Sequence, residues 1–403
     1  MGSVATLSVG NLEIDWGKNF GASNHSRLFQ PDDNKDATYH YADGVVRRHP
    51  ALVRRLRDVR PRLELLGYNL EGARRCYERA LEFYPTYLDE VGIDFDRFTA
   101  VMRSVSVRNV ALAEDDGDFD VGEYVARQVF ADPEFNKVMP LAATGTDVGS
   151  FFENLGPYIQ LRLLMENQDN LDLDLIWRYH DCLDGGWFTE EDVFAPLGPV
   201  DRFLIVTEGG TDSFVIRRAI ELLRPGVADF FRFIDMDAGY PFTGCGNLHK
   251  FTQGLASIEV LNKVLVVFDN DAEGRAKHEA ALRLSLPPSM SVMRLPDLRE
   301  LSSFRTKGPQ GSSMSDINGR AASIECFLDM SVIPGGPWVR WTSYNHELDA
   351  YQGALEDKDR CFAAFRKLRT RDADYDFTRL ENLVDAIVAE CSQIAARHHL
   401  DEL

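Results

Sequence analysis

Short apolar runs alternate with amphipathic segments after residue 200. Four runs have the length of strands, and they cover residues 203–208, 230–236, 264–269 and 290–295. Three segments between them have apolar residues at helical spacing, and they cover residues 212–223, 247–260 and 273–284. This alternation predicts a mostly parallel sheet with helices on its faces, so we expect residues 198–300 to form an α/β domain.

The first half of the chain follows a different pattern. Apolar alternation around Gly10-Asn11 predicts a β-hairpin, and the polar segment 24–35 is typical of a loop. Helices are expected at four places, namely around Leu52, Val53, Leu56 and Val59, and over residues 70–83, 121–130 and 154–179. Proline and glycine at 196–199 indicate a domain boundary, so residues 1–197 are expected to form an α+β, mainly helical domain.

The end of the chain has weaker signals. Residues 305–315 are rich in Gly, Ser and Pro, which is typical of a loop. From residue 316 onward the apolar spacing is mainly helical, with an interruption at 334–337. We therefore expect residues 301–403 to form a mainly helical extension of the α/β domain.

Composition narrows the class of protein. The 403 residues are 44% hydrophobic and 27% charged, which is ordinary for a globular chain of several domains. No apolar run approaches the ~20 residues of a membrane span, and no secretory signal is recognisable. The six cysteines form no Cys-x-x-Cys pair, which argues against a zinc site or a disulfide framework and fits a cytoplasmic protein. A net charge of −20 argues against nonspecific coating of nucleic acid, but it does not exclude a nuclease.

Acidic residues follow two of the predicted strands. Glu208 ends the first run, and Asp269 and Asp271 follow the third. Because parallel strands end at the same edge of a sheet, these carboxylates are expected to lie close together. Repulsion among them would require a cation, and oxygen ligands without His or Cys favour Mg2+ or Mn2+. Taken alone, Asp212 and Asp271 could each be a helix N-cap.

These residues resemble the Toprim domain, the metal-binding module shared by topoisomerases, primases and several nucleases. That family pairs a glutamate after its first strand with an Asp-x-Asp after a later one, and Glu208, Asp269 and Asp271 match those positions. The resemblance covers residues 200–300. It implies a compact α/β fold with Mg2+ or Mn2+ bound by the acids.

The nuclease branch, similar to the overcoming-lysogenization-defect (OLD) family, is the nearer resemblance. It is carried by the further acid Glu273 and by the glycine-rich segment 243–250. It implies that extra residues downstream join the site, for which Glu325 and Lys358 are candidates; the alternatives are a helix surface acid and an exposed helix lysine. The expected metal ligands are Glu208, Asp212, Asp269, Asp271, Glu273 and Glu325. The expected catalytic residues are Glu208, Asp269, Asp271 and Lys358, with Glu208 as an alternative proton relay and Lys358 neutralising charge on the phosphate.

The N-terminal segment resembles the domain fused in front of HEPN or Toprim effector modules in bacterial conflict systems. The resemblance is carried by residues 10–19, 24–29 and 66–74. It implies an antiviral defence setting, in which this domain senses, docks or binds substrate. The chain has no Gly-x-x-x-x-Gly-Lys-Ser/Thr phosphate loop, so nucleotide-driven regulation would need a separate ATPase or sensor chain.

Two further groups of residues are candidates for contacts with nucleic acid. Arg54, Arg55 and Arg57, together with Lys250, are candidates for phosphate contacts, although the arginines could equally form a solvated helix face paired with acids. Arg340 and His346 have the spacing of a HEPN ribonuclease pair on a helix, but the residues between them form a poor helical core.

The sequence therefore predicts a divalent-metal-dependent endonuclease that cleaves phosphodiesters, with DNA favoured over RNA and no membrane partner. Two alternatives stay open. One is a binding module that grips metal and nucleic acid or nucleotide without cutting and acts with a partner. The other is a primase or topoisomerase fragment, for which no tyrosine nucleophile is recognisable. A homo-oligomer is also left open.

Overall fold

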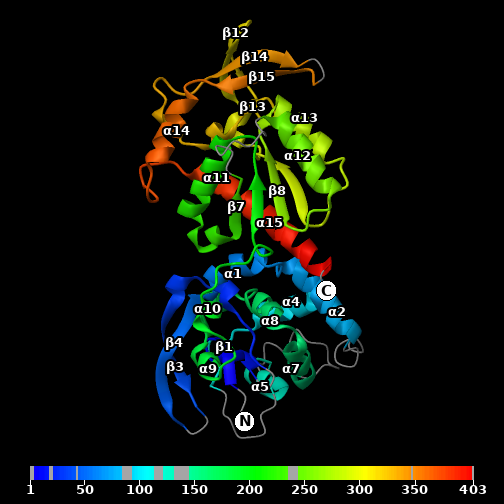
Figure 1. Cartoon of the computed structure of the whole chain (residues 1–403), viewed down its shortest axis with the longest axis vertical. Coiled ribbons are helices and arrows are strands. Elements are labelled where there is room, and N and C mark those ends of the chain that lie inside the picture. The colour runs from blue at the N-terminus through cyan, green and yellow to red at the C-terminus, as the bar shows by residue number, and fades with distance from the viewer. Residues whose placement is uncertain are drawn as a thin grey trace. The chain divides into compact units, whose positions relative to one another are not determined.

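A computed structural model of the chain describes residues 4–17, 21–41, 44–83, 93–112, 121–130, 145–234, 244–345 and 348–401. The chain divides into two compact units, residues 1–196 and 197–402 (Figure 1). Among the described residues, no helix combines the length and the apolar composition that a membrane span needs. The domain boundaries expected at 197 and 300 stay predictions.

A five-stranded antiparallel sheet forms the centre of the first unit, in the order β2-β1-β5-β4-β3. Its strands are β1 (Val4–Val9), β2 (Leu12–Gly17), β3 (Asn34–His40), β4 (Val46–Arg55) and β5 (Asp174–Trp177). The predicted hairpin at Gly10 is confirmed, because Val9 pairs with Leu12 and Gly10 has a φ of 56°, which favours glycine.

Helices surround this sheet. They are α1 (Leu56–Leu65), α2 (Leu70–Phe83), α4 (Phe95–Ser104), α5 (Val121–Gln128), α7 (Gly145–Asn154), α8 (Pro157–Leu164), α9 (His180–Asp184) and α10 (Glu190–Val193). Short 3-10 turns are η1 (Ser26–Leu28), η2 (Pro31–Asp33) and η4 (Gln168–Asp172). The helices predicted over 70–83 and 121–130 are confirmed.

Two helix predictions in this unit are wrong in part. Leu52 and Val53 lie in strand β4, and α1 begins only at Leu56. The segment 154–179 is not one helix, because it ends in β5, which lies between β1 and β4. Leu175 and Trp177 of β5 are completely buried, so pairing with distant strands decides their conformation.

A four-stranded parallel sheet forms the centre of the second unit, in the order β10-β8-β6-β7. Its strands are β6 (Phe203–Val206), β7 (Phe231–Phe233), β8 (Lys263–Phe268) and β10 (Met290–Arg294). The helices that follow or cover them are α11 (Gly210–Leu223), α12 (Cys245–Ser257), α13 (Ala272–Ala281) and α15 (Thr378–Asp401), and η5 (Pro225–Phe230) precedes β7. The predicted parallel α/β pattern is therefore confirmed over this region.

The strand order creates a switch point. From β6 the chain crosses first to β7 on one side and then to β8 on the other. In open α/β sheets the crevice outside the carboxyl ends of two such strands is the usual ligand site. The carboxyl ends of β6 and β8 are where Glu208 and Asp269 follow.

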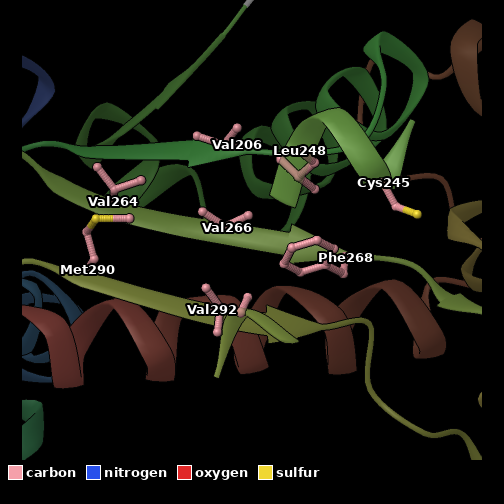
Figure 2. Close-up of a cluster of buried hydrophobic side chains, with 9 residues drawn as sticks. Val206, Cys245, Leu248, Val264, Val266, Phe268, Met290 and Val292 are labelled. Carbon is pink, nitrogen blue, oxygen red and sulfur yellow. The ribbon is translucent and has the colours of Figure 1, made fainter. Parts of the chain in front are cut away.

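The core beneath this edge is apolar. All six residues of β8 are buried, and Figure 2 shows Leu248 and Cys245 of α12 beside Val206, Val266 and Phe268. Burying each side chain of this size stabilises the fold by about 1.5–3 kcal/mol. Helix α15 packs against β8 and β10, so the sheet that carries the acids is held rigidly.

The remainder of the second unit is helical only in part, chiefly at α14 (Lys358–Lys367) and α15, so the prediction of a mainly helical extension over residues 301–403 is wrong in part. It contains a four-stranded sheet in the order β12-β11-β14-β15, made of β11 (Phe304–Gly308), β12 (Gly311–Ser315), β14 (Val339–Asn345) and β15 (Ala350–Leu355). Its other elements are η7 (Arg299–Ser302), β13 (Ala321–Ala322), η8 (Ile324–Phe327), η9 (Met330–Val332) and α14 (Lys358–Lys367). The loop expected at 305–315 is a β-hairpin, whose exposed serines and glycine hide the strand pattern.

Candidate active site

The ends of β6 and β8 bring two acidic residues into contact. Glu208 lies two residues after β6, and Asp269 directly follows β8. The backbone N–H of Asp269 donates to Oε1 of Glu208 at 3.2 Å. The two acids that are 61 residues apart in sequence therefore share one corner of the sheet.

Asp271 caps helix α13. Its Oδ1 accepts a hydrogen bond from the Gly274 N–H at 2.7 Å, and its Oδ2 accepts one from Nε2 of Gln352. Oε1 of Gln352 in turn accepts from the N–H groups of Ala272 at 2.9 Å and Glu273 at 3.3 Å. Gln352, which the sequence analysis missed, thus fixes both the carboxylate and the first turn of the helix.

Asn270 holds the loop between the two aspartates. It is completely buried, and its Oδ1 accepts hydrogen bonds from Nη1 of Arg294 and from the Gly319 N–H, each at 2.9 Å. Its Nδ2 donates to Oδ1 of Asp297 at 2.8 Å. Residues 270–271 form the short strand β9 (Asn270–Asp271), which pairs with β13. The C-terminal region is therefore built directly onto the Asp-x-Asp segment.

Three more charged residues reach this cluster. Asp212 in the first turn of α11 accepts a hydrogen bond from the Gly209 N–H at 3.1 Å. Glu325 is only 7% exposed, and its Oε1 lies 3.1 Å from Nζ of Lys358. The hydroxyl of Ser323 donates to Oε2 of Glu325 at 2.6 Å. Glu325 is thus a buried, paired acid rather than a helix surface acid.

The backbone conformation next to Lys358 and Asp212 helps to position these two side chains. Asp357, which precedes Lys358 at the start of α14, has a left-handed φ of 54°. Gly209, whose N–H donates to Asp212, has a φ of −155°, an extended conformation that any residue adopts.

Burial dominates the electrostatics of the acids. It raises the pKa of Glu208 to about 7, with Asp271 and Asp212 acting in the same direction. It also raises the pKa of Asp212 to about 7, with Glu325 adding to the effect and the Gly209 N–H and Lys358 opposing it.

The pKa values of Asp269 and Asp271, the two aspartates after β8, are raised as well. Burial and then the charges of Asp212 and Glu208 hold the pKa of Asp269 well above its ordinary value. Burial also raises the pKa of Asp271, although its hydrogen bonds from Gly274 and Gln352 oppose the shift. Burial and mutual repulsion therefore make the charged forms of these acids costly.

Lys358 supplies one positive charge to the cluster. Burial lowers its pKa, but the carboxylates of Glu325 and Asp269 outweigh this effect and raise the pKa overall. The ammonium group is therefore charged at neutral pH. A single positive charge does not balance the carboxylates of Glu208, Asp212, Asp269, Asp271 and Glu325.

The oxygen atoms of these side chains are the kind of ligand that a hard cation prefers. Carboxylate oxygens dominate, as Mg2+ and Mn2+ prefer. Cys245 is a neighbour, but burial, Glu273 and Glu208 raise the pKa of its thiol far above neutrality, so it is not a thiolate ligand. Within the described ranges, no group of three or more His, Cys, Asp or Glu side chains is arranged to hold a metal ion. Oε1 of Glu208 and both carboxylate oxygens of Asp271 are instead engaged in the hydrogen bonds given above.

The arginines proposed for phosphate contacts are paired with other groups. Nη1 of Arg54 lies 3.1 Å from Oδ2 of Asp33, and the Arg54 side chain is 9% exposed. Arg55 and Arg57, both more than half exposed, pair with Asp172. These contacts agree with the expected pairing to acids, but the expected helix face is wrong for Arg54 and Arg55, which lie on strand β4. Any role of these arginines in nucleic-acid binding stays a prediction.

Two other basic candidates are also located. Lys250 is exposed on α12, and its expected phosphate contact stays a prediction. Arg340 lies on strand β14, so the helical Arg/His pair of a HEPN ribonuclease is wrong here. His346, the other half of that pair, lies outside the described residues.

Comparison with known proteins identifies the first unit. Residues 1–199 match the family described as HEPN/Toprim N-terminal domain 1, which confirms the HEPN/Toprim association expected for this region. The match ends before β6 and covers none of the acids of the candidate site. No curated protein and no solved structure is significantly similar to the chain.

Proposed function

We propose that this chain is a divalent-metal-dependent endonuclease that hydrolyses phosphodiester bonds in nucleic acid. One observation carries the proposal: three partly buried acids that follow β6 and β8 or begin α11 meet the buried Glu325 of η8 at the switch point of a parallel sheet, together with Lys358. Clustered carboxylates with raised pKa values in such a crevice are typical of a functional site.

The residues that would hold Mg2+ or Mn2+ are Glu208, Asp212, Asp269, Asp271, Glu273 and Glu325. When bound, such an ion would polarise the scissile phosphate and lower the pKa of a water molecule. Glu208, with a pKa of about 7, can accept or return a proton at its carboxylate near neutral pH. Nζ of Lys358 would offset the negative charge that grows on the phosphoryl oxygens.

The first unit supports a nuclease-associated setting. Its family description names both HEPN and Toprim, and the acids of the second unit match the Toprim pattern. We propose that the chain is an effector of bacterial antiviral defence in the cytoplasm. In this proposal the first unit senses, docks or binds substrate, and a separate ATPase or sensor chain or a second copy of the chain acts as partner.

The test is cleavage by the purified full chain. Plasmid, linear DNA and RNA are incubated with Mg2+ or Mn2+, with EDTA as the metal-free arm. Asp269→Asn and Asp271→Asn keep the shape of the side chains but remove the charges, so we expect cleavage to fall to background. Glu279→Gln is the matched control, because Glu279 is an exposed acid on α13 that pairs with Arg275. Wild-type cleavage by the Asp269→Asn protein in a clean preparation would refute the assignment.

A second candidate function is a binding module that grips metal and nucleic acid or a nucleotide without cutting. Metal-dependent binding of DNA, RNA or nucleotide by the wild-type chain, with no cleavage of any substrate, would select this alternative.

A further inference from the structure

An aromatic cluster lies on the small C-terminal sheet, next in sequence to a residue of the candidate site. It consists of Trp341, Tyr344 and Tyr351. The ring centroids of Trp341 and Tyr351 are 6.0 Å apart, and those of Tyr344 and Tyr351 are 5.0 Å apart. Tyr351 directly precedes Gln352, whose amide binds Asp271. The cluster and the acids are therefore joined through a single strand, β15.

The indole of Trp341 lies across the sheet. A Cβ atom at Gly308 of β11 would be 2.9 Å from Cδ1 of this ring, and one at Gly353 of β15 would be 2.8 Å from Cε3. The ring thus spans the backbone on both sides of β14, and the two glycines make room for it. Tyr344 remains 39% exposed, and Trp341 and Tyr351 are half-buried. The three rings therefore form an aromatic surface that is partly exposed to solvent.

The charge of this sheet differs from that of the chain. Its four strands carry Arg305, Lys307 and Arg340 and no Asp or Glu, whereas the whole chain has a net charge of −20. Glu356 pairs with Lys307 and Arg340, which keeps both cations ordered at the sheet. The strands of the small sheet therefore present positive charge to a polyanion, and Glu356 offsets part of it.

The position of the sheet also fits a role at the site. In Figure 1, β14 and β15 lie beyond the carboxyl ends of the parallel strands, on the side where the acids gather. Arg320, an exposed residue with its backbone beside Asp271, accepts a hydrogen bond at its carbonyl from the Gly353 N–H at 3.1 Å. Strand β15, which carries Tyr351, is therefore tied to the Asp-x-Asp segment through Gln352 and through the backbone of Arg320.

We propose that Trp341, Tyr344 and Tyr351 form a stacking platform for the unpaired bases of a nucleic-acid strand. The inference rests on the proposed function, because it names the kind of strand that the acidic site would receive. Bases expose their π faces only where they are not stacked in a duplex, and aromatic side chains bind those faces with little regard for sequence. The substrate class is therefore DNA or RNA with a single-stranded segment, rather than a continuous duplex.

The experiment measures binding by the full chain in EDTA, where no cleavage occurs. The probes are fluorescent single-stranded DNA and RNA oligonucleotides and duplexes of the same sequence, followed by anisotropy. Tyr344→Ala and Tyr351→Ala are expected to weaken single-strand binding by roughly 5- to 150-fold each, which is the usual effect of losing one stacked ring. Tyr344→Phe and Tyr351→Phe keep the ring, so their affinities should stay within about twofold of wild type.

The phenylalanine variants also separate stacking from structure. The hydroxyl of Tyr344 binds Asp349, and Tyr344→Phe removes that bond while it keeps the ring. Trp341 is left unchanged, because its removal would leave a hole between Gly308 and Gly353. Melting temperatures and circular dichroism of every variant establish that the fold is retained. Comparing the DNA and RNA oligonucleotides shows whether the platform accepts strands with deoxyribose or with ribose.

Three results would overturn the platform. The first is equal affinity for single strands and duplexes, and the second is unchanged single-strand binding by both folded alanine variants. The third is an altered oligomeric state of Tyr344→Ala with unaltered binding, which would make this surface a contact between protein copies. The proposed function can fail on its own. If Tyr351→Ala loses single-strand binding while the wild-type chain shows no metal-dependent cleavage, the nuclease assignment is refuted and the platform is supported.

Discussion

Gly274 offers a sharp test of how helix α13 is fitted to the Asp-x-Asp segment. A Cβ atom at this position would lie 2.3 Å from the carbonyl oxygen of Asp269 and 2.9 Å from its carbonyl carbon. Both are backbone atoms, so no flexible side chain can move aside. The change Gly274→Ala must therefore push the first turn of α13 away from β8, by about 1 Å if ordinary van der Waals contact is restored.

Opposing effects decide the size of the change in stability. Alanine is favoured over glycine within a helix by about 1 kcal/mol. Against this, overpacking costs about 1–3 kcal/mol, and displacement of the Gly274 N–H from Asp271 removes a helix cap that contributes about 0.5–2 kcal/mol. We therefore expect Gly274→Ala to lower the free energy of unfolding by about 1–3 kcal/mol, and to reduce cleavage because Asp269 and Asp271 move apart.

The assay is urea denaturation of the full chain, read by circular dichroism, together with the cleavage assay. Gly254→Ala in α12 is the matched control, since a Cβ atom there meets nothing within 4 Å, and it should raise stability by about 0.5–1 kcal/mol. Both glycines lie in the second unit, so they report on the same part of the chain. Gly274→Ala protein that is as stable and as active as wild type would show that the packing argument is mistaken.

Two other predictions address the acids and their support. The raised pKa values of Glu208 and Asp212, both about 7, mean that these two groups bind more protons in the folded chain than in the unfolded chain between about pH 4 and 7. Their contribution to stability should therefore fall as pH rises through this window, so urea titrations in EDTA should show that Asp212→Asn loses less stability than wild type between about pH 4 and 7; an equal or larger loss would contradict the assignment. Gln352→Ala removes the partner of Asp271 and of two α13 N–H groups, so we expect cleavage to drop by about 10- to 100-fold. Gln253→Ala, at an exposed position of α12, is its control and should leave the rate unchanged.

Many features of the second unit could be predicted from the sequence, because the local apolar pattern and the tertiary pairing of the strands favour the same conformation there. Strand β6 and residues 264–268 of β8 are apolar, as is typical of strands buried on both faces, and each run is followed within two residues by an acid. Parallel pairing then places Glu208 and Asp269 at the same edge without any further information. The helices between the strands also agree within a few residues of the prediction.

Strands defined by distant partners were missed. β5 contains Leu175 and Trp177, whose burial depends on β1 and β4, more than a hundred residues earlier. β12 is exposed along most of its length and pairs only with β11 in the sheet, so its serines have no apolar alternation to indicate a strand. In both cases the conformation is set by backbone pairing rather than by the local pattern.

The sequence by itself determined which acids stand at the tips of the parallel strands, since strand length, polarity and chain direction are local properties. Only the tertiary structure decided what surrounds them. Asn270 could be seen as the middle residue of the motif, but its partners Arg294 and Gly319 could not. Gln352 reaches Asp271 from 81 positions away. Such polar contacts leave no periodic trace in a sequence, because one side chain suffices to make them and its position depends on how the whole unit packs.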